Sequence, residues 1–145
     1  MGERTHLGDG MFALDDEECW ELLLHEEVGR LAVSIGNHPD IFPINYVVDV
    51  GGEARSVVFR TAAGTKLAAA VLGEAVAFEI DGYDPGVGDA WSVVVKGTAR
   101  QIEHMIEYYE AEDLPLFPWH AGPKYDFVRI EVDEVTGRRF HVVER

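Results

Sequence analysis

Short runs of strand-forming residues, most of them separated only by turn residues, constrain the fold of this chain more than any other feature. The runs are rich in Val, Ile, Phe and Tyr, and several alternate between apolar and polar residues, as half-buried strands do. Consecutive strands joined by turns favour an antiparallel β-barrel over a βαβ sheet, because parallel strands need long crossovers. We predict strands at residues 29–36, 41–50, 56–61, 74–81 and 90–103, and a final pair within 126–143 that turns near Thr136 and Gly137.

Helical signals are fewer and shorter. Asp15 and Glu18 form a capping-box pattern ahead of a broad apolar stripe, which predicts a helix within residues 14–30. The fold class is therefore mainly β, with a few short helices. Four further elements are expected: helices at 64–73 and 104–113, a turn at 37–40, and a flexible loop at 82–89.

Composition limits the classes of function. The chain has 145 residues and carries 12 Lys and Arg against 27 Asp and Glu, a formal net charge of -15. Such a surface repels phosphate backbones and anionic lipids, which argues against nucleic-acid and membrane-surface roles. The length predicts one domain at residues 14–145, preceded by a flexible N-terminal arm at 1–13.

Cysteine use and targeting signals indicate the compartment. Cys19 is the only cysteine, so no internal disulfide can form, which suits a reducing cytosol. The first residues lack the pattern of a signal peptide, and no apolar run approaches the roughly 20 residues of a membrane span. We therefore expect a cytoplasmic protein.

Residues 59–67, FRTAAGTKL, place two cations around a small-residue turn between a predicted strand and a predicted helix. Arg60 and Thr61 end the strand, and Thr65 and Lys66 open the helix. A guanidinium, an ammonium, hydroxyls and the free N–H groups of a helix start are the donors that phosphate binds. A solvated Arg and Lys beside a turn is the alternative. We favour a phosphate site, because an anion on so acidic a chain needs a local device to hold it.

Two further stretches could contact a ligand, but their residues do not identify which ligand. Pro43 inside a strand removes a ladder donor and indicates an edge or a bulge, and Asn45 adds an amide two positions later. Without further information, an edge strand explains this stretch. Trp91 and Ser92 begin a long strand directly after the predicted loop, where the indole could cover a ligand or simply end the core.

The histidines give no metal site. None of the six has metal-ligand spacing, and no catalytic motif built on His, Cys or Ser is present. Trp119 and His120 lie together in a loop rich in proline, where exposed side chains carry function more often than on a helix face. A packed Trp is nevertheless the commoner outcome.

Taken in order, these segments resemble the pyridoxamine 5′-phosphate oxidase-like family with the FMN-binding split β-barrel fold, in its short actinobacterial-type form. The resemblance runs from about Leu14 to about Arg139 and rests on an ordered set of segments: VGRLAV, PINYVVD, VVFRTAAGTKL, VAFEID, WSVVVKG and PLFPWHAGPKYDFVRIEVDEVTGRR. It implies a homodimer with two flavins at the subunit interface. It also implies two-electron transfer through FMN to or from a small organic substrate.

The resemblance also implies a site. It assigns the flavin phosphate to the residues around the turn, the isoalloxazine ring to the strand with the proline, and further contacts to the long strand, in some relatives from the other subunit. His120 is the one candidate for an acid or base, because imidazole titrates in the useful range. The implied cofactor-binding residues are Pro43, Ile44, Asn45, Arg60, Thr61, Thr65, Lys66, Trp91, Ser92 and Trp119.

Alternatives remain open within this fold. Arg139 and His141 match the Arg-x-His of true pyridoxamine phosphate oxidases, but alternating residues on a terminal strand explain them better, so vitamin B6 oxidation is not predicted. An F420-dependent reductase is a second possibility, although the long anionic tail of F420 favours a wider basic groove than these few cations can line. A dimeric barrel that binds a flavin or another ligand without turnover is the third.

Overall fold

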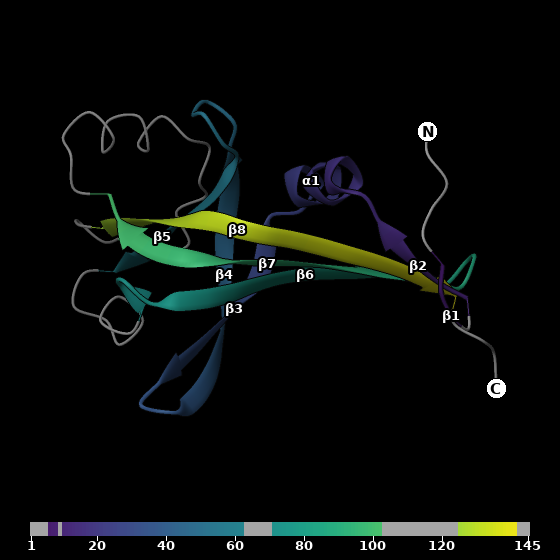
Figure 1. Ribbon diagram of the computed structural model, residues 1–145, viewed down its shortest axis with the longest axis horizontal. Helices are drawn as coiled ribbons and strands as arrows, with labels where there is room; N and C mark the ends of the chain where they lie inside the picture. The colour runs from purple at the N-terminus through teal and green to yellow at the C-terminus, as the bar shows by residue number, and fades with distance from the viewer. Residues whose placement is uncertain (1–5, 9, 63–70, 103–124, 142–145) are drawn as a thin grey trace.

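The computed structural model describes residues 6–8, 10–62, 71–102 and 125–141 (Figure 1). Within these ranges the chain forms one helix and eight strands. They are β1 (His6–Gly8), β2 (Met11–Leu14), α1 (Asp16–His25), β3 (Val28–Ile35), β4 (His38–Asp49), β5 (Ser56–Ala62), β6 (Ala75–Asp84), β7 (Asp89–Gln101) and β8 (Tyr125–His141).

All strand pairs are antiparallel, and the sheet closes on itself. Its order is β1-β2-β8-β5-β4-β3-β6-β7, and an additional pairing of β7 with β8 joins the ends of the last six strands into a barrel. β8 pairs with β7 along one edge, while its other edge is shared by β5 and, further along, by β2. The predicted antiparallel β-barrel is confirmed. β7 and β8 extend past the barrel to the end where β1 and β2 lie (Figure 1).

The helix α1 covers part of the barrel core. The predicted capping box is present: the Glu18 backbone N–H donates to Asp15 Oδ1 at 2.8 Å, and the Asp15 N–H donates to the Glu18 carboxylate at 3.4 Å. Tyr46 ties the helix to β4, because its hydroxyl donates to the Leu23 carbonyl at 2.5 Å. The buried side chains of the core come from every strand of the barrel and from α1, and the largest fully buried ones are Phe59, Phe78, Leu23, Leu31 and Ile80.

The predicted pair of strands within 126–143 is wrong, because β8 is one strand of 17 residues. Gly137, which suggested a turn, instead allows other elements to pack closely against β8. A Cβ at Gly137 would lie 2.6 Å from the Cys19 Sγ and 3.0 Å from Leu14 Cδ1, so the glycine lets α1 and β2 approach the strand. The sequence signal was real, but its cause is close approach rather than chain reversal.

The predicted loop at 82–89 is shorter than expected. β6 continues through Asp84 and β7 begins at Asp89, which leaves only four residues in the turn. Gly82 again serves packing, since a Cβ there would lie 2.6 Å from the Trp91 ring. The Asp84 side chain and carbonyl accept hydrogen bonds from Gly86 and Gly88 and so organise the turn.

The first hairpin turns slightly earlier than the predicted 37–40. Gly36 and Asn37 have φ of 54° and 66°, which is what a two-residue type I′ turn requires. His38 therefore already belongs to β4.

The expected flexible arm at 1–13 contains two strands, β1 and β2, and Met11–Leu14 pairs with β8. The predicted helix at 104–113 and most of the one at 64–73 lie outside the described residues. In the part of the chain that the structure describes, no helix has the length and apolar character to cross a membrane.

Candidate functional site

The strands β4 and β5 pair over only part of their length. Their ladder runs from Asp49 opposite Ser56 to Tyr46 opposite Phe59, and then stops. Beyond that point β4 pairs only with β3, and β5 pairs only with β8. The strands therefore part where Asn45 and Arg60 would have been the next partners.

Pro43 lies in the part of β4 that has a described ladder on one side only. Its partner there is Arg30 of β3, and no pairing with β5 reaches it. The edge-strand interpretation of Pro43 is thus confirmed for the described strands. An unpaired strand edge presents backbone N–H and C=O groups to whatever lies beside it.

The side chains near the parting alternate between the core and the outer face. Ile44 is 7% exposed and belongs to the core, so only its backbone faces outward. Pro43 is exposed and Asn45 is half-buried. Arg60 is half-buried, and its guanidinium carbon lies 6.0 Å from the centroid of the Phe127 ring. The structure therefore places Pro43–Asn45 and Arg60 at the same parting of two strands.

Thr61 pairs with Asp126 of β8 through its backbone, directly after Arg60. The remaining residues of the predicted phosphate site, Thr65 and Lys66, lie outside the described residues, as do Trp119 and His120. Their roles stay predictions.

Trp91 and Ser92 lie at the other end of the barrel strands. Trp91 pairs with Arg139 of β8, whereas Arg60 pairs with Phe127, twelve positions earlier on the same strand. At roughly 3.3 Å per residue, the two points are about 40 Å apart along β8. One chain therefore does not bring Trp91 and Ser92 to Arg60.

A cluster of charges that sequence reasoning missed lies beside Pro43. Arg30 is the cross-strand partner of both Pro43 and Glu79, and its guanidinium contacts Glu79 Oε1 at 2.6 Å and Asp81 Oδ2 at 2.8 Å. Burial raises the pKa of Glu79, a hydrogen bond with Asp81 raises it further, and Arg30 opposes both effects. The only signal that could have revealed this cluster is strand register, which the sequence does not specify directly.

Metal chemistry finds no support in the described part of the chain. No group of three or more His, Cys, Asp or Glu side chains there is arranged to hold a metal ion.

Comparison with known proteins identifies the family. The family model described as pyridoxamine 5′-phosphate oxidase matches residues 15–139. An uncharacterized protein of Mycobacterium tuberculosis, Rv0080, is 34% identical over 131 residues, which cover 87% of this chain and 83% of the relative. The chain belongs to the pyridoxamine 5′-phosphate oxidase-like family, as its resemblance predicted.

Solved structures agree with this assignment. A structure described as the FAD binding protein from Mycobacterium smegmatis is 41% identical, with a TM-score of 0.81, and the match covers 90% of this chain and 99% of that one. A conserved protein of unknown function from Corynebacterium diphtheriae is 40% identical, with a TM-score of 0.80, and the match covers 91% of this chain and 99% of that one. The split β-barrel fold that the resemblance implied is confirmed.

Proposed function

We propose that this protein binds a flavin nucleotide, FMN, and acts as an oxidoreductase that transfers two electrons to or from a small organic molecule. The observation that carries this proposal is the parting of β4 and β5, which sets the cation of Arg60 next to an unpaired backbone edge at Pro43–Asn45. The similar protein from Mycobacterium smegmatis is described as binding FAD. FAD contains the whole of FMN, so one phosphate anchor serves either flavin.

The residues present fit a flavin in three ways. Arg60 supplies a guanidinium for the phosphate, and Thr61, Thr65 and Lys66 follow it in sequence as further donors. The edge of β4 supplies backbone N–H and C=O groups for a flat heterocycle. Pro43 and Asn45 add a rigid apolar surface and an amide on the same outer face.

A bound flavin supplies the two-electron redox chemistry, while the protein contributes position and electrostatics. Arg30 lies opposite Pro43 on β3, and its carboxylate partners Glu79 and Asp81 lie one strand further away, on β6. The raised pKa of Glu79 favours its protonated form more than that of an ordinary glutamate. Glu79 is therefore a second candidate for an acid or base, besides His120, although it accepts two hydrogen bonds from Arg30 and lies two strands from Pro43.

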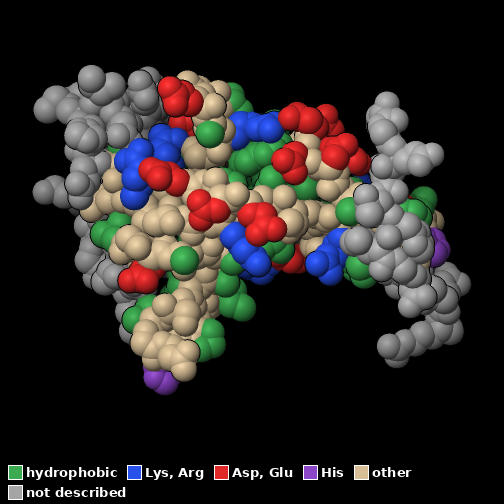
Figure 2. Space-filling view, in the orientation of Figure 1, with side chains coloured by type: hydrophobic (Ala, Val, Ile, Leu, Met, Phe, Trp, Pro, Cys, Tyr) green, Lys and Arg blue, Asp and Glu red, His purple; other side chains and the backbone are tan. Residues whose placement is uncertain are grey.

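We also propose that the site is completed by a second copy of this chain. Trp91 and Ser92 are about 40 Å along β8 from the position of Arg60, at about 3.3 Å per residue, so they can serve the same flavin only from the other subunit. The β3–β4 hairpin projects from the barrel, and Figure 2 shows hydrophobic side chains on its surface. Val28, Ile35 and Ile41 of this hairpin are 40%, 49% and 63% exposed.

A shallow apolar hollow next to the hairpin supports the same interface. It has a volume of about 350 Å³ and is lined mainly by small residues of β3 and β6, among them Ala32, Ala75 and Ala77. Ile41 is the cross-strand partner of Ala32, so the exposed side chain and the hollow share one face. Exposed apolar surface of this kind is typical of association between subunits.

Electron transfer is tested with the FMN-loaded protein. The flavin is reduced with dithionite under anaerobic conditions and then mixed with a quinone or with a nitroaromatic compound, and its reoxidation is followed by absorbance at the flavin band. We expect reoxidation by at least one of the two to be faster than that of free reduced FMN under the same conditions. Reoxidation no faster than that of free FMN with either compound would instead favour a flavin-binding protein without turnover.

A further inference from the structure

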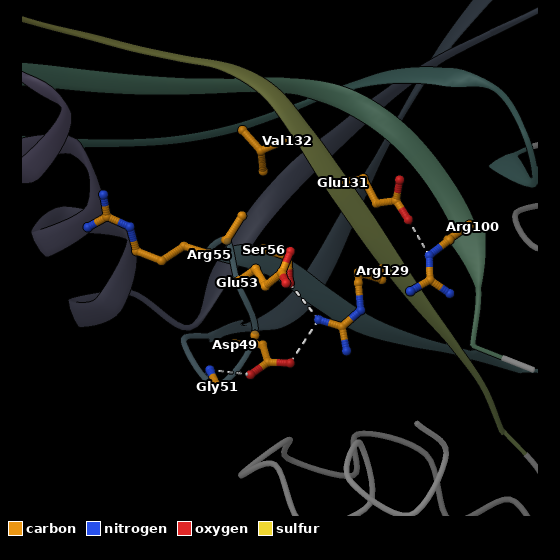
Figure 3. Close-up of a pocket in the computed structure, with 11 residues that line it drawn as sticks. Asp49, Gly51, Glu53, Arg55, Ser56, Arg100, Arg129, Glu131 and Val132 are labelled. Carbon is orange, nitrogen blue, oxygen red and sulfur yellow. Dashed lines mark hydrogen bonds and ion pairs between the residues drawn. The ribbon is translucent and has the colours of Figure 1, made fainter. Parts of the chain in front are cut away.

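A cavity of about 740 Å³ with several charged residues in its lining lies beside the loop that joins β4 to β5 (Figure 3). Its walls come from Asp49 and that loop, from the end of β7 and from the middle of β8. Pockets that bind small molecules typically have volumes of about 300–1,000 Å³. Three of the 12 Lys and Arg residues of this acidic chain line it: Arg55, Arg100 and Arg129.

Arg129 is held firmly at the cavity wall. Its side chain is only 13% exposed, and its Nη1 donates to Asp49 Oδ2 at 2.8 Å and to Ser56 Oγ at 2.6 Å. Burial works against ionisation of Asp49, but hydrogen bonds from the Gly51 N–H and from Arg129 outweigh it and lower the pKa of the carboxyl. The pair is therefore charged at neutral pH, and it fixes one side of the guanidinium.

The other side of the Arg129 guanidinium can bind a ligand. Within the described residues, its Nε and Nη2 groups form no hydrogen bond with the protein. Because the orientation of this guanidinium is fixed, its remaining N–H groups are well suited to form a bidentate interaction with a carboxylate or a phosphate. The cavity thus contains a pre-oriented donor for an oxyanion.

A second guanidinium faces the same region. Arg100 of β7 is the direct cross-strand partner of Arg129, and its Nε donates to the Glu131 carboxylate. As cross-strand partners, the two arginines project from the same face of the sheet. Figure 3 shows Arg129 beside Asp49 and Arg100 beside Glu131. Like charges directly opposite each other destabilise a strand pair. The flanking carboxylates already reduce the repulsion between the two arginines. An oxyanion bound by both guanidinium groups would reduce it further.

The cavity lies next to the proposed flavin site. On the outer face of β5 and β8, Arg60 and Arg129 are diagonal neighbours, because Val58 lies opposite Arg129 and Phe127 lies opposite Arg60. The side chains of Val58 and Phe127 are buried, at 0% and 4% exposed. The cavity lining does not include Arg60. An anion in the cavity would therefore contact Arg129 rather than Arg60.

We propose that this cavity is a second ligand site, which binds the carboxylate or phosphate group of a small organic anion through Arg129 and Arg100. The volume of about 740 Å³ leaves room for the rest of the molecule along the Gly51–Gly52 loop towards Arg55. The Glu53 carboxylate lines the same cavity and can accept hydrogen bonds from hydroxyl or amino groups of that ligand. The anionic group, bound by the two arginines, sets the orientation of the ligand in the cavity.

The test uses the full-length protein and two probes, inorganic phosphate and citrate. Each is titrated while the Nε–H resonances of the arginines are followed by nitrogen-proton correlation NMR. We expect saturable shifts at Arg129 and Arg100 with at least one probe. Arg129→Gln and Arg100→Gln should each weaken that binding at least tenfold, because each removes a charged hydrogen bond.

The matched control is Arg138→Gln, which removes an exposed arginine of β8 that does not line the cavity. It should change the affinity less than twofold. Arg100→Gln leaves the Arg129–Asp49 pair intact, so a fold defect of Arg129→Gln does not decide the outcome. Shifts with neither probe, shifts that persist unchanged in both cavity variants, or an equal loss in the control would overturn the proposal.

A separate FMN titration of Arg100→Gln distinguishes this site from the proposed flavin site. We expect FMN affinity to stay within twofold of that of the unchanged protein while the affinity for the anionic probe falls. A parallel tenfold loss of both would show that the two ligands share one site, and the inference of a second site would then be wrong.

Discussion

Replacing Arg60 with alanine is expected to weaken FMN binding at least tenfold. Arg60 is the first residue of β5 beyond its ladder with β4, at the position that would have faced Asn45 had the pairing continued. A hydrogen bond to a charged group contributes about 1.5–3 kcal/mol, and about 1.4 kcal/mol corresponds to a factor of ten in affinity. The measurement is a fluorescence titration of the purified apo-protein with FMN.

The matched control for this variant is Arg55→Ala. Arg55 is a similarly half-exposed arginine that pairs with Glu17 and lies 5.0 Å from the centroid of the Trp20 ring, in a different part of the surface. The Arg55→Ala variant removes the same charge from the chain as Arg60→Ala, so any general electrostatic effect on FMN affinity appears in both variants. An FMN affinity that is equal in Arg60→Ala and Arg55→Ala would refute the phosphate role of Arg60.

Replacing Ile41 with aspartate is expected to convert the proposed homodimer to monomers. Ile41 is 63% exposed on the projecting hairpin, next to the apolar hollow. A carboxylate buried at an interface without a partner costs several kcal/mol, since it loses its hydration. Light scattering coupled to size-exclusion chromatography, at micromolar protein concentration, measures the mass of each variant. The monomer should also bind FMN more weakly, because it lacks the contribution of the other subunit.

Leu24→Asp serves as the control for the interface. Leu24 is similarly exposed, at 56%, but lies on α1. This variant should keep the mass of the unchanged protein. A monomeric mass for the unchanged protein, or a dimer that persists in Ile41→Asp, would contradict the proposed interface.

The existence of most elements could be predicted from the sequence, while their lengths could not. The capping box at Asp15 and Glu18 is a local signal, and it is confirmed. Gly137 and Gly82 looked like turn residues, yet both make room for side chains of neighbouring elements, Cys19 and Trp91 respectively. A glycine gives the same local signal in both situations, and only tertiary packing distinguishes them.

Part of the candidate site could likewise be predicted from the sequence, and part could not. The chemistry of Arg60 and of the Pro43 edge could be read locally, because a cation at a strand end and a proline in a strand each have a direct physical meaning. The place where β4 and β5 part, and the contact of Arg30 with Glu79 and Asp81, depend on strand register and were not predictable. Register is set by pairings between segments that are far apart in sequence.

Cofactor binding is the measurement that tests the account most directly. Apo-protein is titrated separately with FMN, FAD and F420, and binding is followed by the change in ligand fluorescence. We expect saturable binding of FMN at one site per chain, and binding of FAD as well if the shared phosphate anchor suffices. Binding of F420 alone would change the cofactor, and the absence of binding with all three would contradict the proposal that the parting of β4 and β5 is a flavin site.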